Sequence, residues 1–203
     1  MAVIDVERAG AVGLAAGPSG FGEKLRVLGV AEAELADAIE VGAGGTAYLT
    51  ADERTVRPAA RLLVTGDIDR FKRWIGRPDE EGAEAGVPLP GPWPERAGRD
   101  AGGLTAAEWR TLNLAGNAYL FGDSRRVPEY KHLLETYRAP FTAAVHAVRK
   151  VVIGPEASLV VEGIPAILVF EELVIHDTGR LVAYTAVNAT FGRLHKLEGG
   201  RHA

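Results

Sequence analysis

Four carboxylates in the C-terminal third of the chain could carry out general acid–base chemistry. Hydrolysis of a glycosidic bond uses two carboxyl groups on one face, one as proton donor and one as base or nucleophile. The spacing of these four places them in different turns and corners, where solvated turn residues account for them more simply. They therefore define only an alternative function, a carbohydrate-binding or carbohydrate-active β-helix protein with a glycan partner. These residues are Glu162, Glu171, Glu172 and Asp177.

Other catalytic and cofactor signatures are missing from the sequence. The chain has no cysteine, which excludes disulfides, thiolate metal sites and a cysteine nucleophile. None of its histidines has the paired spacing of a zinc-binding helix. We therefore expect no catalytic residue, no metal and no cofactor. The five histidines are His132, His146, His176, His195 and His202.

A 22-residue repeat is the strongest pattern in the sequence. Val151 lies 22 residues before Leu173, and Leu159 lies 22 residues before Leu181. The same shift carries residues 143–148 onto 165–170 and then onto 187–192. A fixed period in runs of β-branched residues is typical of stacked rungs, each rung being one circuit of the chain. The repeat therefore predicts a short parallel β-solenoid with 22-residue rungs.

Alternation within the repeat predicts which side chains face the core. The inward pairs are Val151/Leu173, Ile153/Ile175, Leu159/Leu181 and Val161/Ala183. The outward apolar residues require a cover, which a second subunit could supply. We expect them to form an interface between subunits. The predicted interface residues are Val152, Val174, Val160, Val182 and Leu168.

A charged column accompanies the apolar ones. Arg149, Glu171 and Arg193 fall at the same position of successive rungs. Strands in adjacent rungs lie about 4.8 Å apart, so aligned side chains contact each other. Alternating charge makes this stacking ladder favourable.

Propensity and capping predict the elements before the repeat. Residues 31–41 are rich in Ala and Glu and predict a helix that Gly42 ends. Strands are expected at 46–50 and 60–65. A short helix at 68–75 begins after Asp67, a good N-cap.

A helical hairpin is predicted between a Pro-rich segment and the repeat. Thr105 and Glu108 form a capping box at the start of one helix, and a second helix covers about 128–137. The preceding segment, 76–103, is rich in proline and glycine, and Trp93 is expected to anchor it to its own domain.

These elements predict an α+β protein. Its parts are a small N-terminal α/β region at 1–75, a Pro/Gly-rich linker at 76–103, the helical hairpin at 104–142 and the β-solenoid-like part at 143–203. The alternative fold is an antiparallel β-sandwich that uses the same strands, with the 22-residue match accidental.

Composition narrows the function classes. The formal net charge of −4 argues against a nucleic-acid partner, and no apolar run is long enough to span a membrane. The first residues lack the basic start of a secretion signal, so we expect a cytoplasmic protein. The resulting hypothesis is a non-enzymatic structural or self-assembly protein that forms homo-oligomers through its β-rich C-terminal half.

Overall fold

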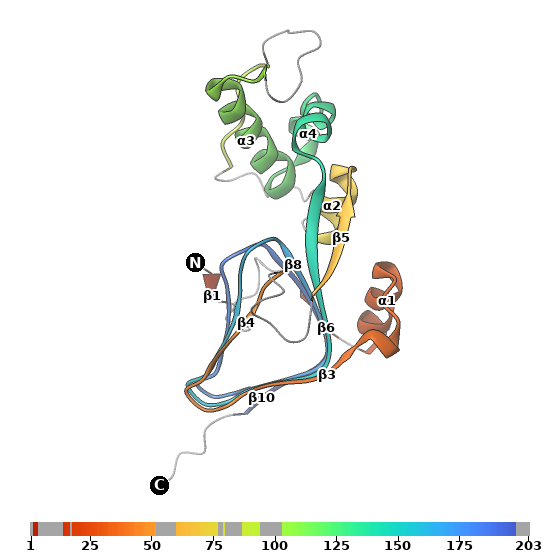
Figure 1. Ribbon diagram of the computed structural model, residues 1–203, viewed down its shortest axis with the longest axis vertical. Coiled ribbons are helices and arrows are strands. Elements are labelled where there is room, and N and C mark those ends of the chain that lie inside the picture. The colour runs from red at the N-terminus through yellow and green to blue at the C-terminus, as the bar shows by residue number, and fades with distance from the viewer. Residues whose placement is uncertain are drawn as a thin grey trace. The chain divides into compact units, whose positions relative to one another are not determined.

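Two units make up the chain, and the first is built from both ends of the sequence. The computed structural model describes residues 2–3, 14–16, 18–51, 60–76, 79, 87–93 and 103–197. Unit 1 comprises residues 1–63 and 142–203, and unit 2 comprises residues 64–141 (Figure 1). Unit 2 is therefore inserted into the sequence of unit 1. This division follows the packing of the chain, whereas the predicted boundaries divide the sequence into consecutive segments.

Unit 1 contains two sheets whose strands pair mainly in parallel. One sheet has the order β1-β9-β7-β4, and the other has the order β2-β10-β8-β6-β3, with β5 paired to β6. The strands that follow unit 2 are β6 (Phe141–Ile153), β7 (Ser158–Val161), β8 (Ala166–His176), β9 (Arg180–Ala183) and β10 (Val187–Leu197). The strands before them are β1 (Ala2–Val3), β2 (Leu14–Ala16), β3 (Ala36–Val41), β4 (Thr46–Leu49) and β5 (Arg61–Thr65).

The parallel pairing decides between the two predicted folds. Val151–Ile153 in β6 pairs with β3 and β8, whereas Leu159–Val161 in β7 lies in the other sheet. The antiparallel sandwich is therefore wrong, and helices combined with parallel-strand sheets confirm the mixed α+β class. No helix in the described ranges combines the length and apolar character needed to cross a membrane.

The 22-residue spacing holds for two of the strand pairs and becomes 21 for the last. Val151 pairs with Leu173, and Leu159 pairs with Leu181. Leu173, however, pairs with Leu194, only 21 residues later. The connection between β9 and β10 is one residue shorter than that between β7 and β8. The predicted alignment of Ile167 with Ala189 is consequently wrong, since Ala189 pairs with Leu168.

A further set of strands lies ahead of those that the repeat predicted. Ile39 in β3 pairs with Val151, and Thr46 in β4 pairs with Ser158, both in parallel. The predicted helix at 31–41 is therefore wrong, because only Glu32–Glu34 form a short 3-10 helix and β3 follows. Burial of alternate residues in β3 outweighs the helix propensity of Ala and Glu.

Strands that share a register form four layers. Layer 1 contains β3 and β4, layer 2 contains β6 and β7, layer 3 contains β8 and β9, and layer 4 contains β10. Figure 1 shows the layers lying over one another around a three-sided outline. Side 1 holds the first halves of β6, β8 and β10, side 2 holds their second halves with β3, and side 3 holds β4, β7 and β9.

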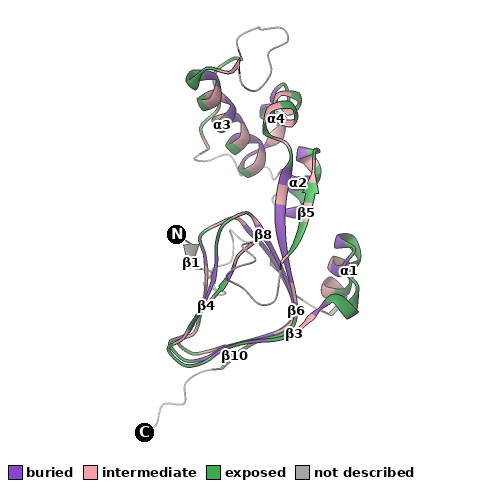
Figure 2. Cartoon of the chain, in the orientation of Figure 1, coloured by how far each residue is buried: buried purple, intermediate pink, exposed green. Residues whose placement is uncertain are grey.

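The interior of this outline is the core of unit 1 (Figure 2). Every residue that the alternation predicted to face inward belongs to it, which confirms the predicted inward set. The rings of Phe170 and Phe191, in neighbouring layers, stack with centroids 5.7 Å apart. The confirmed inward residues are Val151, Ile153, Leu159, Val161, Leu173, Ile175, Leu181 and Ala183.

The N-terminal strands lie against the last layers. β2 pairs in parallel with β10, where Leu14 is opposite Ala189 and Ala16 is opposite Phe191. β1 pairs antiparallel with β9. Helix α1 (Pro18–Leu28) contacts β8 and β10. Short strands of the chain itself therefore cover parts of the end formed by β9 and β10.

Unit 2 contains the predicted helices. Helix α2 (Ile68–Trp74) begins with the Asp67 carboxylate accepting from two backbone N–H groups. Helix α3 (Ala106–Phe121) begins with the predicted capping box of Thr105, and α4 (Tyr130–Arg138) follows the short 3-10 helix η3 (Ser124–Arg126). These predictions are confirmed.

Most of the predicted linker at 76–103 lies outside the described residues. The Trp93 ring, which is described, lies 6.3 Å from the ring of Tyr137. This contact confirms that Trp93 packs within its own part of the chain.

One buried histidine makes the core of unit 1 sensitive to acid. His146 pairs with Leu168 of the core and is only 1% exposed. Neither of its ring nitrogens has a hydrogen-bond partner among the described residues. Burial lowers the pKa of His146 to about 4, so the folded protein holds the ring neutral at pH 7.

We predict that His146→Leu raises stability and removes part of its pH dependence. Between about pH 6.5 and 4 the unfolded chain binds a proton that the folded chain excludes, so His146 lowers stability as pH falls through this window. The stability lost because of His146 should reach about 3 kcal/mol at pH 4. Denaturant unfolding at pH 7 and pH 4.5 measures it. Replacing the exposed His132 by Gln is the control. If the free energy of unfolding of His146→Leu falls between pH 7 and pH 4.5 as much as that of the wild type, the prediction is contradicted.

Candidate functional site

The four carboxylates proposed from the sequence do not form one site. Glu171 and Glu172 are adjacent residues within β8. Asp177 lies in the connection from β8 to β9, and Glu162 lies in the connection from β7 to β8. These positions are three different segments of unit 1. The four carboxylates therefore come from separate segments, apart from the adjacent Glu171 and Glu172.

The predicted stacking ladder has its charged groups close together, but the predicted alignment of Arg193 with Glu171 is wrong. Arg193 pairs with Glu172, because the spacing from β8 to β10 is 21 residues, and it contacts Glu171 diagonally. An oxygen of Glu171 lies 3.9 Å from Arg149 Nη1, and the other lies 3.5 Å from Arg193 Nη2. Asp37 of β3 adds a member that sequence reasoning missed, with its Oδ1 4.0 Å from Arg149 Nε. The sequence did not predict Asp37 as a member because residues 31–41 were expected to be helical. Aligning Ile39 with Val151 would have revealed it.

The charged ladder, as we call Asp37, Arg149, Glu171 and Arg193, alternates in sign through all four layers. Beside it, Glu172 Oε1 lies 4.0 Å from Lys150 Nζ and 3.9 Å from His195 Nε2. The members of the ladder are largely exposed, and an exposed ion pair contributes about 0–1 kcal/mol. The ladder therefore contributes little to stability but favours one order of layers over others.

The predicted interface residues divide into core and surface. Leu168 is 0% exposed and belongs to the core, so its assignment to an interface is wrong. Val160 is only 7% exposed. Val152, Val174 and Val182 are half-buried. Of the five, only these last three present appreciable surface to a partner.

Side 2 has strand edges at both ends of the stack. β3 pairs with β6, and in the described part of the chain no strand pairs with its other edge. β10 pairs with β2 only at residues 189–191, so residues 193–197 have a described neighbour on the β8 side alone. These residues are exposed. Side 2 therefore carries backbone groups on which a further strand could pair.

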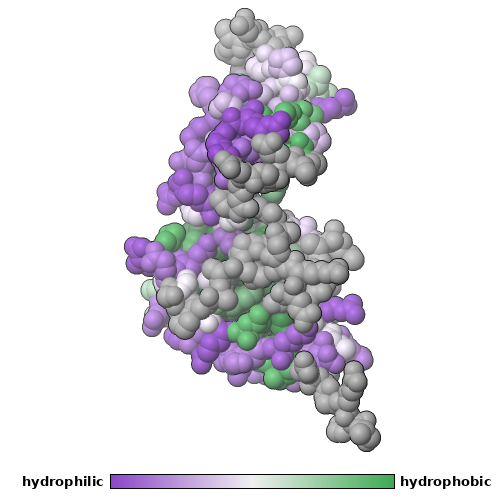
Figure 3. All heavy atoms as spheres, turned by 180° about the vertical axis from the view of Figure 1, so that it is seen from behind, coloured by the Kyte–Doolittle hydropathy of each residue, from purple (hydrophilic) through white to green (hydrophobic). Residues whose placement is uncertain are grey.

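Figure 3 shows the molecule from the opposite side to Figure 1. Hydrophobic surface lies in the middle of unit 1, with hydrophilic surface around it. The large apolar side chains that are exposed in unit 1 include Tyr48 of β4 and Leu194 of β10. Both lie in the outermost layers of the stack.

Unit 2 contains a cluster of polar groups around the buried Lys72, which we tested as a candidate catalytic site. Lys72 is 5% exposed and donates to Asp79 Oδ1 at 2.5 Å. It also donates to the carbonyl oxygens of Tyr119 and Gly122, at 2.6 and 2.8 Å. These carbonyls belong to the end of α3, where the helix leaves acceptors without partners. Lys72 therefore satisfies a helix terminus.

Asp79 completes the cluster. Ser124 donates to it from both its backbone N–H and its hydroxyl. Burial alone would raise the pKa of Asp79, but the hydrogen bonds from Lys72 and Ser124 outweigh burial and lower it. The carboxylate stays charged and the Ser124 hydroxyl donates to it, so the cluster has neither a free base nor an activated nucleophile.

A second group of polar side chains in unit 2 is also held together by hydrogen bonds. The Tyr119 hydroxyl and Lys131 Nζ both donate to Asp69, each at 2.5 Å. Burial and the adjacent Asp69 carboxylate raise the pKa of Tyr119. The phenol therefore remains protonated, and the group connects α2, α3 and α4 instead of offering an acid or a base.

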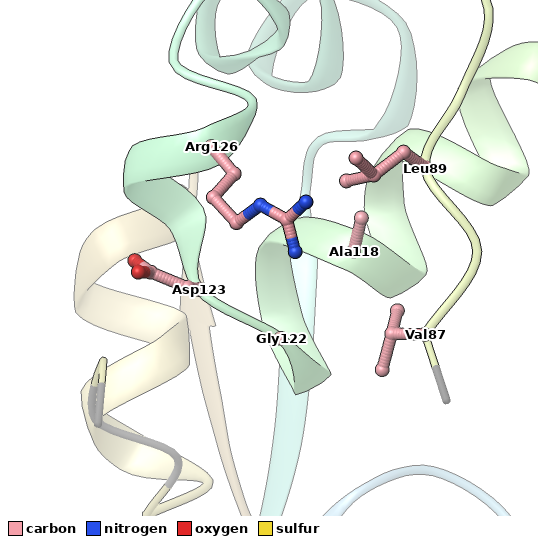
Figure 4. A pocket seen from close by; sticks show the side chains of 6 residues that line it. All are labelled: Val87, Leu89, Ala118, Gly122, Asp123 and Arg126. Atoms are coloured by element: carbon pink, nitrogen blue, oxygen red, sulfur yellow. The ribbon is translucent and has the colours of Figure 1, made fainter. Parts of the chain in front are cut away.

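Two hollows of the described surface differ in size. One in unit 2 has a volume of about 10 Å³, room for about one water molecule. Figure 4 shows the Arg126 side chain extending over this hollow toward Leu89, while the Asp123 carboxylate points away from it.

A wider hollow in unit 1, of about 260 Å³, lies beside Val145 and Ala147. Its charged residues are paired with each other, since Arg61 lies 3.2 Å from Glu34 and donates to the carbonyl oxygen of Gly29. Within the described ranges, no group of acidic or histidine side chains is placed to hold a metal ion.

No known protein family, characterised protein or solved structure matches this chain. The function must therefore be inferred from the molecule's own surfaces. Among the described residues, the strand edges of side 2 are a feature that no strand of the chain fully pairs.

We predict that Lys72→Met destabilises the protein by about 3 kcal/mol, because it leaves a carboxylate and two helix-end carbonyls without their donor. Lys131→Met is the matched control: it removes a half-exposed ion pair of the same helical unit and should cost less than about 1 kcal/mol. Denaturant unfolding compares the two variants. Equal losses would show that the buried contacts of Lys72 add nothing.

Proposed function

We propose that this protein is a non-enzymatic structural protein that self-assembles into homo-oligomers through unit 1. In this proposal the four layers are the rungs of a short parallel β-solenoid. Each rung of such a stack buries its apolar face only against its neighbours, so the terminal rungs are completed by a cap or by another subunit.

The open strand edge of β3 is the observation that carries this proposal. The Gly154 N–H donates to the Val41 carbonyl, so Val41 directs its peptide groups toward β6. Neighbouring residues of a strand direct theirs to opposite sides, and the groups of Ala38 and Glu40 therefore face away from β6. No described strand accepts them. Such an edge is a template for a strand of another chain.

Exposed apolar side chains in the outer layers support the same conclusion. Tyr48 stands in the column of Val160 and Val182 and is 45% exposed. The half-buried Val152 and Val174 form a second outward pair, on side 2. Apolar surface next to an unpaired edge favours burial by a subunit. The separation of the four carboxylates removes the reason for proposing a glycan ligand.

We predict that the wild-type protein has a mass in solution above that of its 21.5 kDa chain and that this mass rises with concentration. Light scattering coupled to size exclusion measures it. Ala38→Pro should lower the mass, since proline removes an N–H from the open edge and not from the β3–β6 pairing. Ala38→Val keeps the N–H and is the control. A 21.5 kDa species at every concentration would disprove self-assembly.

A further inference from the structure

The two ends of side 2 carry opposite charges. The first layer presents Asp37 and Glu40, both exposed and both acidic. The last layer presents the basic Arg193, which is 58% exposed, and His195, which is 51% exposed. The acidic pair lies on β3, the edge strand of the first layer, and the other pair lies on β10, the strand of the last layer.

From these charges we infer that the copies stack head to tail, with β3 of one copy adding in parallel to residues 193–197 of β10 in the next. This inference rests on the proposed self-assembly and specifies its surface and polarity. The occupant of each open edge is a second copy of this chain.

The charged ladder would continue across such a contact. It contains four members of alternating sign, beginning with Asp37 and ending with Arg193. With Ile39 of the next copy opposite Leu194, Ala38 falls opposite Arg193 and Asp37 lies one residue away, the same diagonal offset at which Glu171 contacts Arg193 within the chain. The alternation of charge therefore continues diagonally. In the neighbouring column Glu40 pairs with Val152, Val152 with Val174 and Val174 with His195. The next Glu40 would therefore follow His195.

An apolar column continues in the same register. Ile39, Val151, Leu173 and Leu194 are paired through the four layers. Leu194, at the end, is 36% exposed, whereas Leu173 between two layers is 0% exposed. Ile39 of the next copy would cover Leu194 as Leu194 covers Leu173. Lateral pairing of apolar residues in adjacent strands is favourable.

Stacking with two acidic ends together is disfavoured. It would bring Asp37 and Glu40 near their own copies, and like charges on adjoining strands repel. Two basic ends would place Arg193 near its own copy. Lys196 also pairs in register with Ile175 and is exposed, and a charged residue on an edge strand weakens indiscriminate strand addition. Complementary charge therefore selects the partner end.

Two charge-reversal variants test this polarity. Asp37→Lys/Glu40→Lys makes the acidic end basic, and Arg193→Glu/His195→Glu makes the basic end acidic. Each variant alone should associate at least about tenfold more weakly than the wild type, because like charges then meet at every contact. An equimolar mixture should recover the wild-type mass, since each end finds an opposite one. Recovery also demonstrates that both variants are folded.

The matched control reverses two other carboxylates. Glu162→Lys/Asp177→Lys changes the net charge by the same amount as Asp37→Lys/Glu40→Lys, in the connections β7–β8 and β8–β9 and outside the terminal strands β3 and β10, and should keep the wild-type mass. The wild-type assembly should weaken at 1 M salt, where the screening length is about 3 Å.

The outcomes separate the two proposals. A wild-type oligomer whose mass survives both reversals, or a mixture that fails to reassemble, overturns head-to-tail stacking and leaves self-assembly in place. Loss of assembly in Asp37→Lys/Glu40→Lys alone, with Arg193→Glu/His195→Glu unaffected, shows copies meeting through their acidic ends and also overturns it. A wild-type monomer at every concentration overturns both proposals.

Discussion

Lateral pairing of parallel strands is the interaction on which unit 1 depends. Each layer supplies only a few inward side chains, and these are buried because the same positions of the next layer lie against them, as with Val151, Leu173 and Leu194. A single layer has no core of its own, so stability is shared between neighbours. The end layers gain this burial from one side only. Their exposed residues and strand edges follow from the architecture and are the places where a partner can contribute most.

The same dependence explains how the chain accommodates unit 2. The insertion separates β4 from β6 in the sequence, yet Ile39 pairs with Val151 and Leu49 pairs with Val161 at one constant offset. Both strands of layer 1 therefore keep their register with layer 2 across the inserted residues. Long insertions at a connection cost little free energy because the entropy of closing a loop grows slowly with its length. Unit 2 in turn has its own buried contacts, such as those of Lys72.

The sequence predicted correctly those parts of the fold that follow from one local pattern, such as a repeat or a helix cap. The repeat gave the pairing of layers 2 and 3 and their inward residues, and the capping box at Thr105 gave the start of α3. Layer 1 could not be recognised locally: Ala and Glu favour a helix at 31–41, and only pairing with the distant Val151 makes these residues a strand. The shift from 22 to 21 residues depends on the length of one connection, which the repeat does not show. Leu168 was placed on the surface although it belongs to the core, because both faces of residues 167–170 are buried and alternation cannot separate them.

The charged ladder shows how a weak interaction can still determine structure. Its ion pairs span 3.5 to 4.0 Å between exposed groups, and each adds little to the free energy of folding. Specificity, however, is a difference between arrangements, and reversing the order of two layers would replace attraction with repulsion in the column. Hydrophobic pairing along side 2 cannot make this distinction, because Ile39 and Leu194 would suit either end. In the stacking that we propose, backbone edges and apolar columns thus provide the affinity of the strand-to-strand contact, and the sign of the terminal charges decides which ends meet.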